Sequence, residues 1–307
     1  MKKCSRVLFI GTICIVSLWV VGLLFTDRWV WSQWLSWIPT LFLLVLLLIS
    51  GSFCLVSKAK TNTITLGCIF VFVFYWYVFV ANSFAGVEKK GSLRIVGWTM
   101  SYSKQKVSKE SAKEVVRLQG DITLLTHGWI VRGEPVIKEW LGAEHKRVIN
   151  GPFTVLTRLP ILEVRTIIAS NGVYVSMFRI DTTEQLGEPL VLWAVDLPSN
   201  ITIPKIDTAE RVKRLLTTVE LQRPDIVMGD FNMTRNSYSM KTMFPELIDA
   251  SNVAGVGLLA SFPMNVPLYH IDHTLLSKDV RCTAYKLINP KIGRHRVQIV
   301  TLSPTKQ

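Results

Sequence analysis

Cysteine is scarce in the greater part of this 307-residue chain. Five cysteines are present, and four of them lie in or beside long apolar runs near the N-terminus: Cys4, Cys14, Cys54 and Cys68. Cys282 alone belongs to the remaining sequence, which excludes a disulfide within that part. The 217 residues that follow residue 90 are nevertheless enough to bury a sizeable core without one.

Acidic residues are also few, at 22 Asp and Glu against 35 Lys and Arg. Residues 1–90 hold eight of the basic residues and two of the acidic ones, so the remainder holds 27 and 20. This remainder is moderately basic, which favours anionic partners such as phosphate esters, nucleic acid or anionic lipid head groups. A solvated surface that merely avoids neutrality explains the same balance equally well.

Charge is absent from three stretches, residues 7–26, 38–57 and 64–84. Each is about 20 residues long, which is enough for a helix to cross the apolar core of a bilayer. The first run is too long for a cleaved signal peptide, and no small-residue cleavage site follows it. The sequence therefore predicts a membrane anchor of three transmembrane helices over residues 1–85, then a linker over 86–92 and a domain over 93–307.

The flanking charges predict an orientation for this anchor. Basic residues precede the first span and separate the second from the third, whereas the first loop holds one arginine among four tryptophans typical of a membrane interface. These residues are Lys2, Lys3, Arg6, Lys58 and Lys60, and Arg28, Trp29, Trp31, Trp34 and Trp37. The positive-inside rule places the N-terminus in the cytoplasm and the C-terminal domain outside it. Lys89, Lys90 and Arg94, after the third span, argue against that orientation.

Residues 93–307 alternate between strand and helix patterns, which suggests two sheets packed face to face with helices outside, an α/β sandwich. We expect Val173–Ile180 and Leu190–Asp196 to pair. The other expected strands are Leu93–Met100, Ile122–Leu125, Phe153–Leu159, His270–Ser277, Val280–Ile288 and Arg296–Leu302, and the expected helices are Ser108–Gln119 and Thr208–Leu221.

The stretch Asp225–Asn232 reads as a short buried strand that ends at Gly229-Asp230-Phe231-Asn232. Ligands and metals collect at the C-terminal ends of strands in α/β sheets. Asp230 and Asn232 would offer oxygens to a divalent cation, or an acceptor and a donor around a phosphate and its water. A plain Asx turn accounts for the same four residues, because Gly, Asp and Asn are common turn formers.

Seven short motifs, taken in order, resemble the endonuclease/exonuclease/phosphatase superfamily over residues 93–303. They are Leu93-Arg94-Ile95-Val96-Gly97-Trp98, Leu124-Leu125-Thr126-His127, Thr157-Arg158-Leu159-Pro160-Ile161, Val191-Leu192-Trp193-Ala194-Val195-Asp196, Gly229-Asp230-Phe231-Asn232, Ile271-Asp272-His273 and Gly293-Arg294-His295-Arg296. The resemblance implies a four-layered α/β sandwich that hydrolyses phosphate esters with a divalent metal, usually magnesium or manganese. A three-helix anchor before such a domain resembles a bacterial branch, which implies a multi-pass protein of the bacterial inner membrane.

The resemblance also assigns roles to four residues. Asp230 would place and activate the attacking water, and Asn232 would steady the phosphate. His295 matches the last histidine of the family. Asp272 matches the acid that partners the family's other histidine, so these four residues are the predicted catalytic group.

Four positions depart from the family pattern. His127 stands where the family has its metal-binding glutamate, and Asp196 stands where it has its other histidine. Thr99 occupies the position of an asparagine at the end of the first strand, and Arg294 occupies the position of an acid just before the last histidine. Imidazole suits zinc, manganese or iron better than magnesium, so His127 and Asp196 are the predicted ligands of a manganese or zinc ion. If Asp196 faces Asp272, the two must share a proton or a cation. Arg294 would attract a phosphate.

Three functions therefore remain open. The chain is expected to be a membrane-anchored hydrolase of phosphate mono- or diesters. Alternatively, it binds a phosphorylated or anionic ligand through Arg294, His127 and Asn232 without cleaving it. A structural membrane protein whose domain serves only for contacts is the third possibility. The substrate could be nucleic acid, a lipid head group or a small phosphoester.

Overall fold

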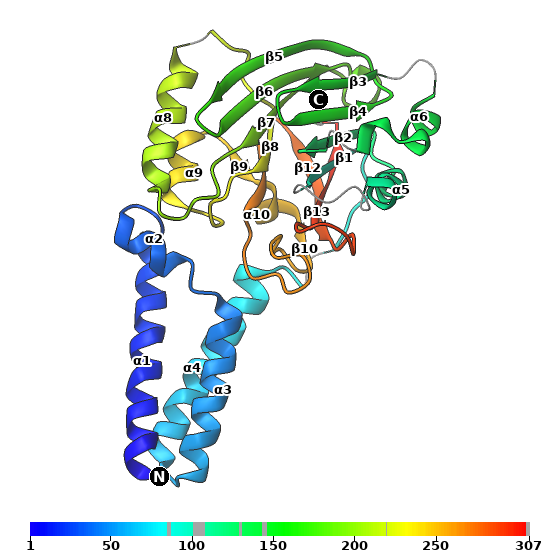
Figure 1. Cartoon of the computed structure of the whole chain (residues 1–307). Helices are drawn as coiled ribbons and strands as arrows, with labels where there is room; N and C mark the ends of the chain where they lie inside the picture. The colour runs from blue at the N-terminus through cyan, green and yellow to red at the C-terminus, as the bar shows by residue number, and fades with distance from the viewer. Residues whose placement is uncertain (85–86, 101–107, 129–130, 143–145, 219, 305–307) are drawn as a thin grey trace.

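The computed structural model describes residues 1–84, 87–100, 108–128, 131–142, 146–218 and 220–304. An elongated bundle of helices, residues 2–81, leads into a β-rich domain that begins at residue 93 (Figure 1). We call the helical part the stem. Residues 85 and 86, the last of the predicted anchor and the first of the predicted linker, lie outside the described residues.

The stem consists of α1 (Lys2–Phe25), α2 (Val30–Ser36), α3 (Thr40–Val56), α4 (Lys60–Trp76) and a π-helical turn (Tyr77–Ala81). Within the described chain, Lys2–Phe25 and Lys60–Ala81 are each long and apolar enough to cross a membrane. The pair α2 and α3, bent by 65°, would be a third span if counted as one. The predicted runs 7–26, 38–57 and 64–84 thus coincide with α1, α3 and α4 apart from their ends.

The domain contains two mixed β-sheets. The strand order is β10-β12-β13-β1-β2-β4-β3 in the seven-stranded sheet and β5-β6-β7-β8-β11-β9 in the six-stranded sheet. In the first sheet the strands are β1 (Leu93–Thr99), β2 (Ile122–Thr126), β3 (Lys146–Asn150), β4 (Phe153–Thr157), β10 (Gly255–Val256), β12 (Arg281–Ile288) and β13 (Val297–Ser303). In the second they are β5 (Ile161–Ser170), β6 (Val173–Ile180), β7 (Leu190–Asp196), β8 (Ile226–Asp230), β9 (Ile248–Asp249) and β11 (Asp272–Leu276).

Apolar side chains fill three layers of core, one between the sheets and one outside each sheet. Ile95 and Leu124 of one sheet meet Leu192 and Met228 of the other in the central layer. Helices α8 (Lys205–Thr217) and α9 (Tyr238–Met243) cover the six-stranded sheet, and α5 (Ser108–Leu118) and α6 (Pro135–Leu141) cover the other. Two short helices, α7 (Thr183–Leu186) and α10 (Ala250–Ala254), complete the described elements together with a 3₁₀ turn at Val131–Gly133. The predicted four-layered α/β sandwich is confirmed.

The expected pairing of Val173–Ile180 with Leu190–Asp196 is present as the antiparallel pair β6 and β7. Four strands were not predicted, β3, β5, β9 and β10. All four are at edges of their sheets, and β5 exposes most of its length to solvent and pairs with β6 through two register shifts. An edge strand carries charged residues and lacks a clean apolar period, so its sequence resembles a loop.

One end of the sandwich rests on the stem. In the turn after α1, Thr26 Oγ1 and Asp27 Oδ1 accept hydrogen bonds from the backbone amides of Tyr238 and Ser239, at 3.0 and 3.1 Å. These amides begin α9, so the turn satisfies donors that a helix start leaves open. On the other side, Gln33 of α2 donates to the carbonyl of Ile201 at 2.8 Å.

Candidate active site

Five strand ends bring polar side chains to one end of the sandwich. Asp196 ends β7, Asp230 ends the parallel strand β8, and Asp272 begins the antiparallel strand β11. The register pairs Asp230 with both of the other aspartates. In the other sheet, Thr99 ends β1 beside the end of β2, after which His127 follows directly.

Gly229 allows two of these aspartates to lie side by side. Its φ is +151°, and a Cβ at this position would lie 1.9 Å from the carbonyl oxygen of Val195. Only glycine permits so close an approach of β7 and β8. Three residues later, Asn232 adopts a left-handed φ of 49°. Its amide N–H donates to Asp230 Oδ1 at 3.0 Å, and its side chain donates to the carbonyl of Leu197 at 2.9 Å. The Gly-Asp-Phe-Asn loop is therefore an Asx-type turn that fixes the Asp230 carboxylate.

Asp272 holds His295. The Nδ1 atom of His295 lies 2.8 Å from Asp272 Oδ2, and Thr99 Oγ1 donates to Asp272 Oδ1 at 2.5 Å. Asp272 was predicted to contact the side chain at position 196, where the family has its other histidine. That prediction is wrong, because Asp272 contacts His295 instead. His295 precedes β13 of the facing sheet, and Thr99 also comes from that sheet, so the partners of Asp272 lie across the sandwich rather than along its own sheet.

His127 faces Asp196, with Nε2 3.0 Å from Oδ2. Its backbone has a left-handed φ of 57°, which is uncommon for a residue other than glycine, and its amide donates to the carbonyl of Pro152 at 2.7 Å. The expected contact of Asp196 with Asp272 is replaced by this pair, in which an imidazole meets the carboxylate. The structure thus brings together six of the seven predicted site residues, Asp196, Asp230, Asn232, Asp272, His295 and His127.

The charges at this end of the sandwich are strongly coupled. Burial raises the pKa of Asp230 well above its usual value, the charge of Asp272 adds to this, and His295 opposes it. Burial would also raise the pKa of Asp272, but the charge and hydrogen bond of His295 outweigh it and lower that pKa. Burial disfavours the charged form of His295, yet Asp272 and Asp230 together raise its pKa to about 9. His295 is therefore an imidazolium at neutral pH.

Arg294, the seventh predicted residue, lies beside this group with an exposed side chain. Its guanidinium carbon is 5.6 Å from the ring centroid of Phe262, and that ring is 4.9 Å from the ring of His295. The charge of Arg294 acts to lower the pKa of His295. An anion near His295 would therefore have this second cation beside it.

Two supporting residues were not predicted. Ser261 Oγ accepts hydrogen bonds from the amides of Ile271 and Asp272, at 3.2 and 3.1 Å, and so fixes the start of β11. Lys205 is buried, and its Nζ donates to the carbonyl of Pro198 at 2.7 Å. Burial lowers the pKa of Lys205 to about 8 although the charge of Asp230 opposes the shift. Neither residue belongs to a recognisable motif, so no sequence signal would have found them.

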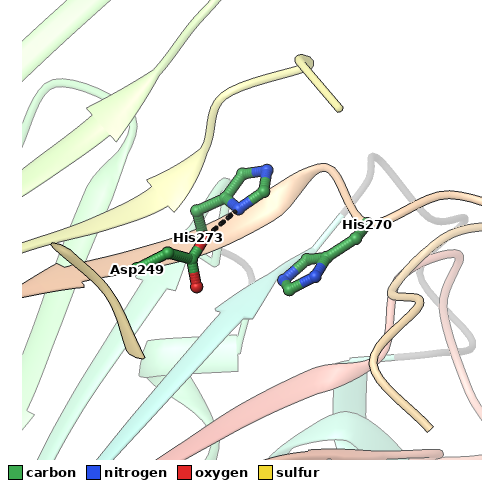
Figure 2. A group of neighbouring side chains, drawn as sticks. All are labelled: Asp249, His270 and His273. Carbon is green, nitrogen blue, oxygen red and sulfur yellow. Dashed lines mark hydrogen bonds and ion pairs between the residues drawn. The ribbon is translucent and has the colours of Figure 1, made fainter. Parts of the chain in front are cut away.

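A second buried group, Asp249, His270 and His273, lies on neighbouring segments of the same sheet (Figure 2). His273 Nδ1 lies 2.8 Å from Asp249 Oδ2, and its Nε2 lies 2.9 Å from the carbonyl of Met233. The rings of His270 and His273 stack at 4.5 Å, and burial is the main cause that lowers the pKa of His270 to about 3.

These three side chains could hold a metal ion, since their donor atoms lie within 4.8 Å of one another. However, a carbonyl can only accept, so His273 Nε2 donates to Met233, and its Nδ1 lies within hydrogen-bond distance of Asp249. Both ring nitrogens of His273 are thus satisfied without a metal. We interpret the contact of His273 with Asp249 as a buried hydrogen bond that ties β11 to β9.

No protein-family model and no curated protein matches this sequence. Solved structures do match the fold. A mannosyl-6-phosphatase of Bacteroides thetaiotaomicron aligns with 69% of this chain and 99% of its own, at 14% identity and a TM-score of 0.54. An endonuclease/exonuclease/phosphatase protein of Bacteroides vulgatus aligns with 69% of this chain and 99% of its own, at 14% identity and a TM-score of 0.52. A truncated TDP2 of Caenorhabditis elegans aligns with 69% of this chain and 97% of its own, at 14% identity and a TM-score of 0.52. At these identities the likeness shows a shared fold.

Proposed function

We propose, on the premise that this chain has the fold of the endonuclease/exonuclease/phosphatase superfamily, that it hydrolyses phosphate mono- or diesters. The observation that carries the proposal is the Asp272–His295 pair beside Asp230, all buried at one end of the sandwich. A fold alone does not imply a function, and these are the side chains that the reaction requires.

The donor set fits a divalent cation. Asp230 and Asp272 are adjacent, buried carboxylates, and burial, with the charge of Asp272 added to it, raises the pKa of Asp230. A cation beside them would remove that cost, as is general for clustered carboxylates. Asp230 and Asp272 would hold the cation, and Asp196 with His127 would supply further ligands, whereas His295 stays protonated beside them. We propose manganese or zinc if His127 is a ligand, and magnesium or manganese otherwise.

When bound, such a cation neutralises charge on the phosphate and lowers the pKa of bound water. The chain's own residues perform the proton transfers. Asp230, fixed by the amide of Asn232, accepts a proton from the attacking water as the water oxygen forms the new bond to phosphorus. His295, held by Asp272, donates a proton to the ester oxygen as the old bond to phosphorus breaks. Asn232 and Arg294 would bind the remaining phosphate oxygens.

We further propose that the stem is a membrane anchor. The division is that predicted above, with three spans over residues 1–85, a linker over 86–92 and the domain over 93–307. The apolar helices of the stem support it, as do the exposed tryptophans Trp29, Trp31 and Trp34 at the end that carries the domain. The proposed topology has a cytoplasmic N-terminus and an extracytoplasmic domain in a bacterial inner membrane. A phosphatase reporter active only outside the cytoplasm, fused after residue 90, would be inactive if the orientation is reversed.

Metal dependence tests the proposed reaction. The full chain in detergent is stripped with a chelator, and hydrolysis of bis(4-nitrophenyl) phosphate is measured after adding back magnesium, manganese or zinc. We expect no turnover without metal and recovery with manganese or zinc. Absence of turnover with all three metals would reject the proposal.

A second candidate is a relative that binds an anionic ligand without cleaving it. The observation that favours it is the His127–Asp196 pair, in which two positions of the expected metal site already satisfy each other. Such a protein would bind inorganic phosphate after chelation and would lose that binding in Arg294→Ala. Binding that disappears on chelation would instead favour the hydrolase.

A further inference from the structure

Two loops border the catalytic residues and continue to the stem. The first, residues 197–204, directly follows Asp196 at the end of β7. The second, residues 262–269, begins with Phe262, whose ring lies 4.9 Å from that of His295, and in it the amide of Met264 donates to the carbonyl of Arg294 at 2.7 Å. Both loops therefore lie next to residues of the candidate site.

Both loops meet the same part of the stem. Gln33 of α2 donates to the carbonyl of Ile201 and accepts from the amide of Lys205, each at 2.8 Å. In the second loop, the ring of Tyr269 lies 4.9 Å from that of Trp37. These contacts fix the catalytic end of the domain against the segment that joins α2 to α3.

An apolar groove of about 570 Å³ lies at this junction. It is lined from the stem by Trp34, Trp37 and Phe42, and from the two loops by Ile201, Leu268 and Tyr269. None of its described lining residues is charged. Phe42 belongs to the apolar helix α3 and is half exposed, so the groove continues onto the outer surface of that helix.

This groove suits one class of substrate. A nucleic acid would need cations along its path, and a small sugar phosphate would gain nothing from an apolar wall next to the site. A membrane lipid carries its phosphate beside an apolar chain, and the surface of α3 is where such chains would lie if the stem spans a bilayer.

We propose that the substrate is a phosphate ester carried by a membrane lipid, whose apolar part enters the groove between α2–α3 and the two loops while its phosphate reaches His295 and Asp230. This inference rests on the proposed phosphoesterase function. The reaction is the hydrolysis described above, with the lipid or its head-group alcohol as the leaving group that takes the proton from His295.

The test compares lipid with soluble ester in the full chain. Turnover is measured for dioleoyl phosphatidic acid and dioleoyl phosphatidylglycerol in vesicles, and for glycerol 3-phosphate and glycerophosphoglycerol in solution. We expect the vesicle lipid to be turned over at least tenfold faster, and Ile201→Asp to remove that preference while turnover of the soluble ester is kept. Ile149→Asp is the matched control, because Ile149 on the edge strand β3 is 45% exposed and Ile201 is 43% exposed.

A binding experiment separates the two ways of failing. A photoreactive phosphatidic acid with a diazirine in its acyl chain is crosslinked to the protein, and labelled peptides are mapped. We expect labels on residues 33–42 and 199–203, reduced in Ile201→Asp. Turnover of soluble ester with neither lipid preference nor labelling in the groove overturns this inference and leaves the hydrolase standing. Labelling without any turnover refutes the hydrolase, and with it the lipid as substrate, and leaves only a lipid-binding groove.

Discussion

The imidazole of His127 and the carboxylate of Asp196 lie 3.0 Å apart, at strand ends where the family resemblance predicts a glutamate and a histidine respectively. Relative to that expectation, the acid and the imidazole are exchanged between the two strands. An exchange of this kind conserves the types of donor available at the site and changes where the negative charge lies. Under the proposed function, the two substituted positions would therefore still offer ligands to a cation.

Returning the two residues to the expected strands should change the preferred metal. In the double variant His127→Glu/Asp196→His, a carboxylate replaces imidazole on the β2 side, and carboxylate oxygen suits magnesium better. We expect the ratio of activity with magnesium to activity with manganese to rise at least tenfold. The single variant His127→Glu, which sets two carboxylates against each other, is the control and should lose affinity for phosphate. An unchanged ratio in the double variant would show that neither residue binds the metal.

The imidazolium of His295 should make stability depend on pH. Its pKa is about 9 in the folded protein and about 6.5 when unfolded, so its contribution is complete below pH 6.5 and is lost as the pH rises through 9. The contribution is on the order of 1–3 kcal/mol. Lys205, with its pKa lowered to about 8, acts in the opposite sense above pH 8, so wild type alone cannot isolate the effect.

The comparison with His295→Gln removes this ambiguity. The difference in thermal unfolding midpoint between wild type and variant, measured in detergent, should be largest near pH 6 and should shrink by pH 9.5. A difference that stays constant over this range would mean that His295 does not carry the raised pKa.

Thr99 should stabilise Asp272 through a single hydrogen bond. Thr99→Val keeps the shape of the side chain and removes the donor to Asp272 Oδ1, which is buried. We expect a loss of about 1–3 kcal/mol, because a buried acceptor loses its partner. Thr99→Ser retains the hydroxyl and should lose less than half as much. Equal losses in the two variants would indicate that packing of the methyl group is what matters.

Gly229 should be irreplaceable for steric reasons. Gly229→Ala places a Cβ against the backbone of Val195 at a φ of +151°, so we expect a loss of about 3 kcal/mol or more, or failure to fold. Gly187→Ala is the control, since φ there is +95° and nothing lies within 4 Å of the added atom. It should lose about 1 kcal/mol, the usual cost of a left-handed conformation. Thermal unfolding of the purified full chain measures both, and equal losses would contradict the steric argument.

The sequence predicted the central strands because their signals are local. Val173–Ile180, Leu190–Asp196 and the strand that ends at Asp230 are apolar runs that stop at turn residues, and the structure places them within a residue or two of the expected bounds. The helix predicted at Thr208–Leu221 begins earlier, at Lys205, and ends at Thr217, since exposed helix ends carry weak signals.

The partners of the site residues could not be predicted in the same way. Asp272 contacts His295 and Thr99 because two sheets face each other, and no pattern along the chain specifies which strand ends meet across a sandwich. The hydrogen bond of Asp249 with His273 likewise joins residues 24 positions apart. A motif identified Asp272, but only the packing of the sheets identified what it holds.

The rate of bis(4-nitrophenyl) phosphate hydrolysis by wild type and by Asp230→Asn, in the presence of manganese, tests the central claim most directly. The variant keeps the size of the side chain and removes the carboxylate that accepts the proton from water. The account predicts turnover by wild type and at least a hundredfold loss in the variant, with the unfolding midpoint unchanged or raised because a buried charge is removed. Equal rates in the two proteins would show that Asp230 takes no part in the reaction and would contradict the account.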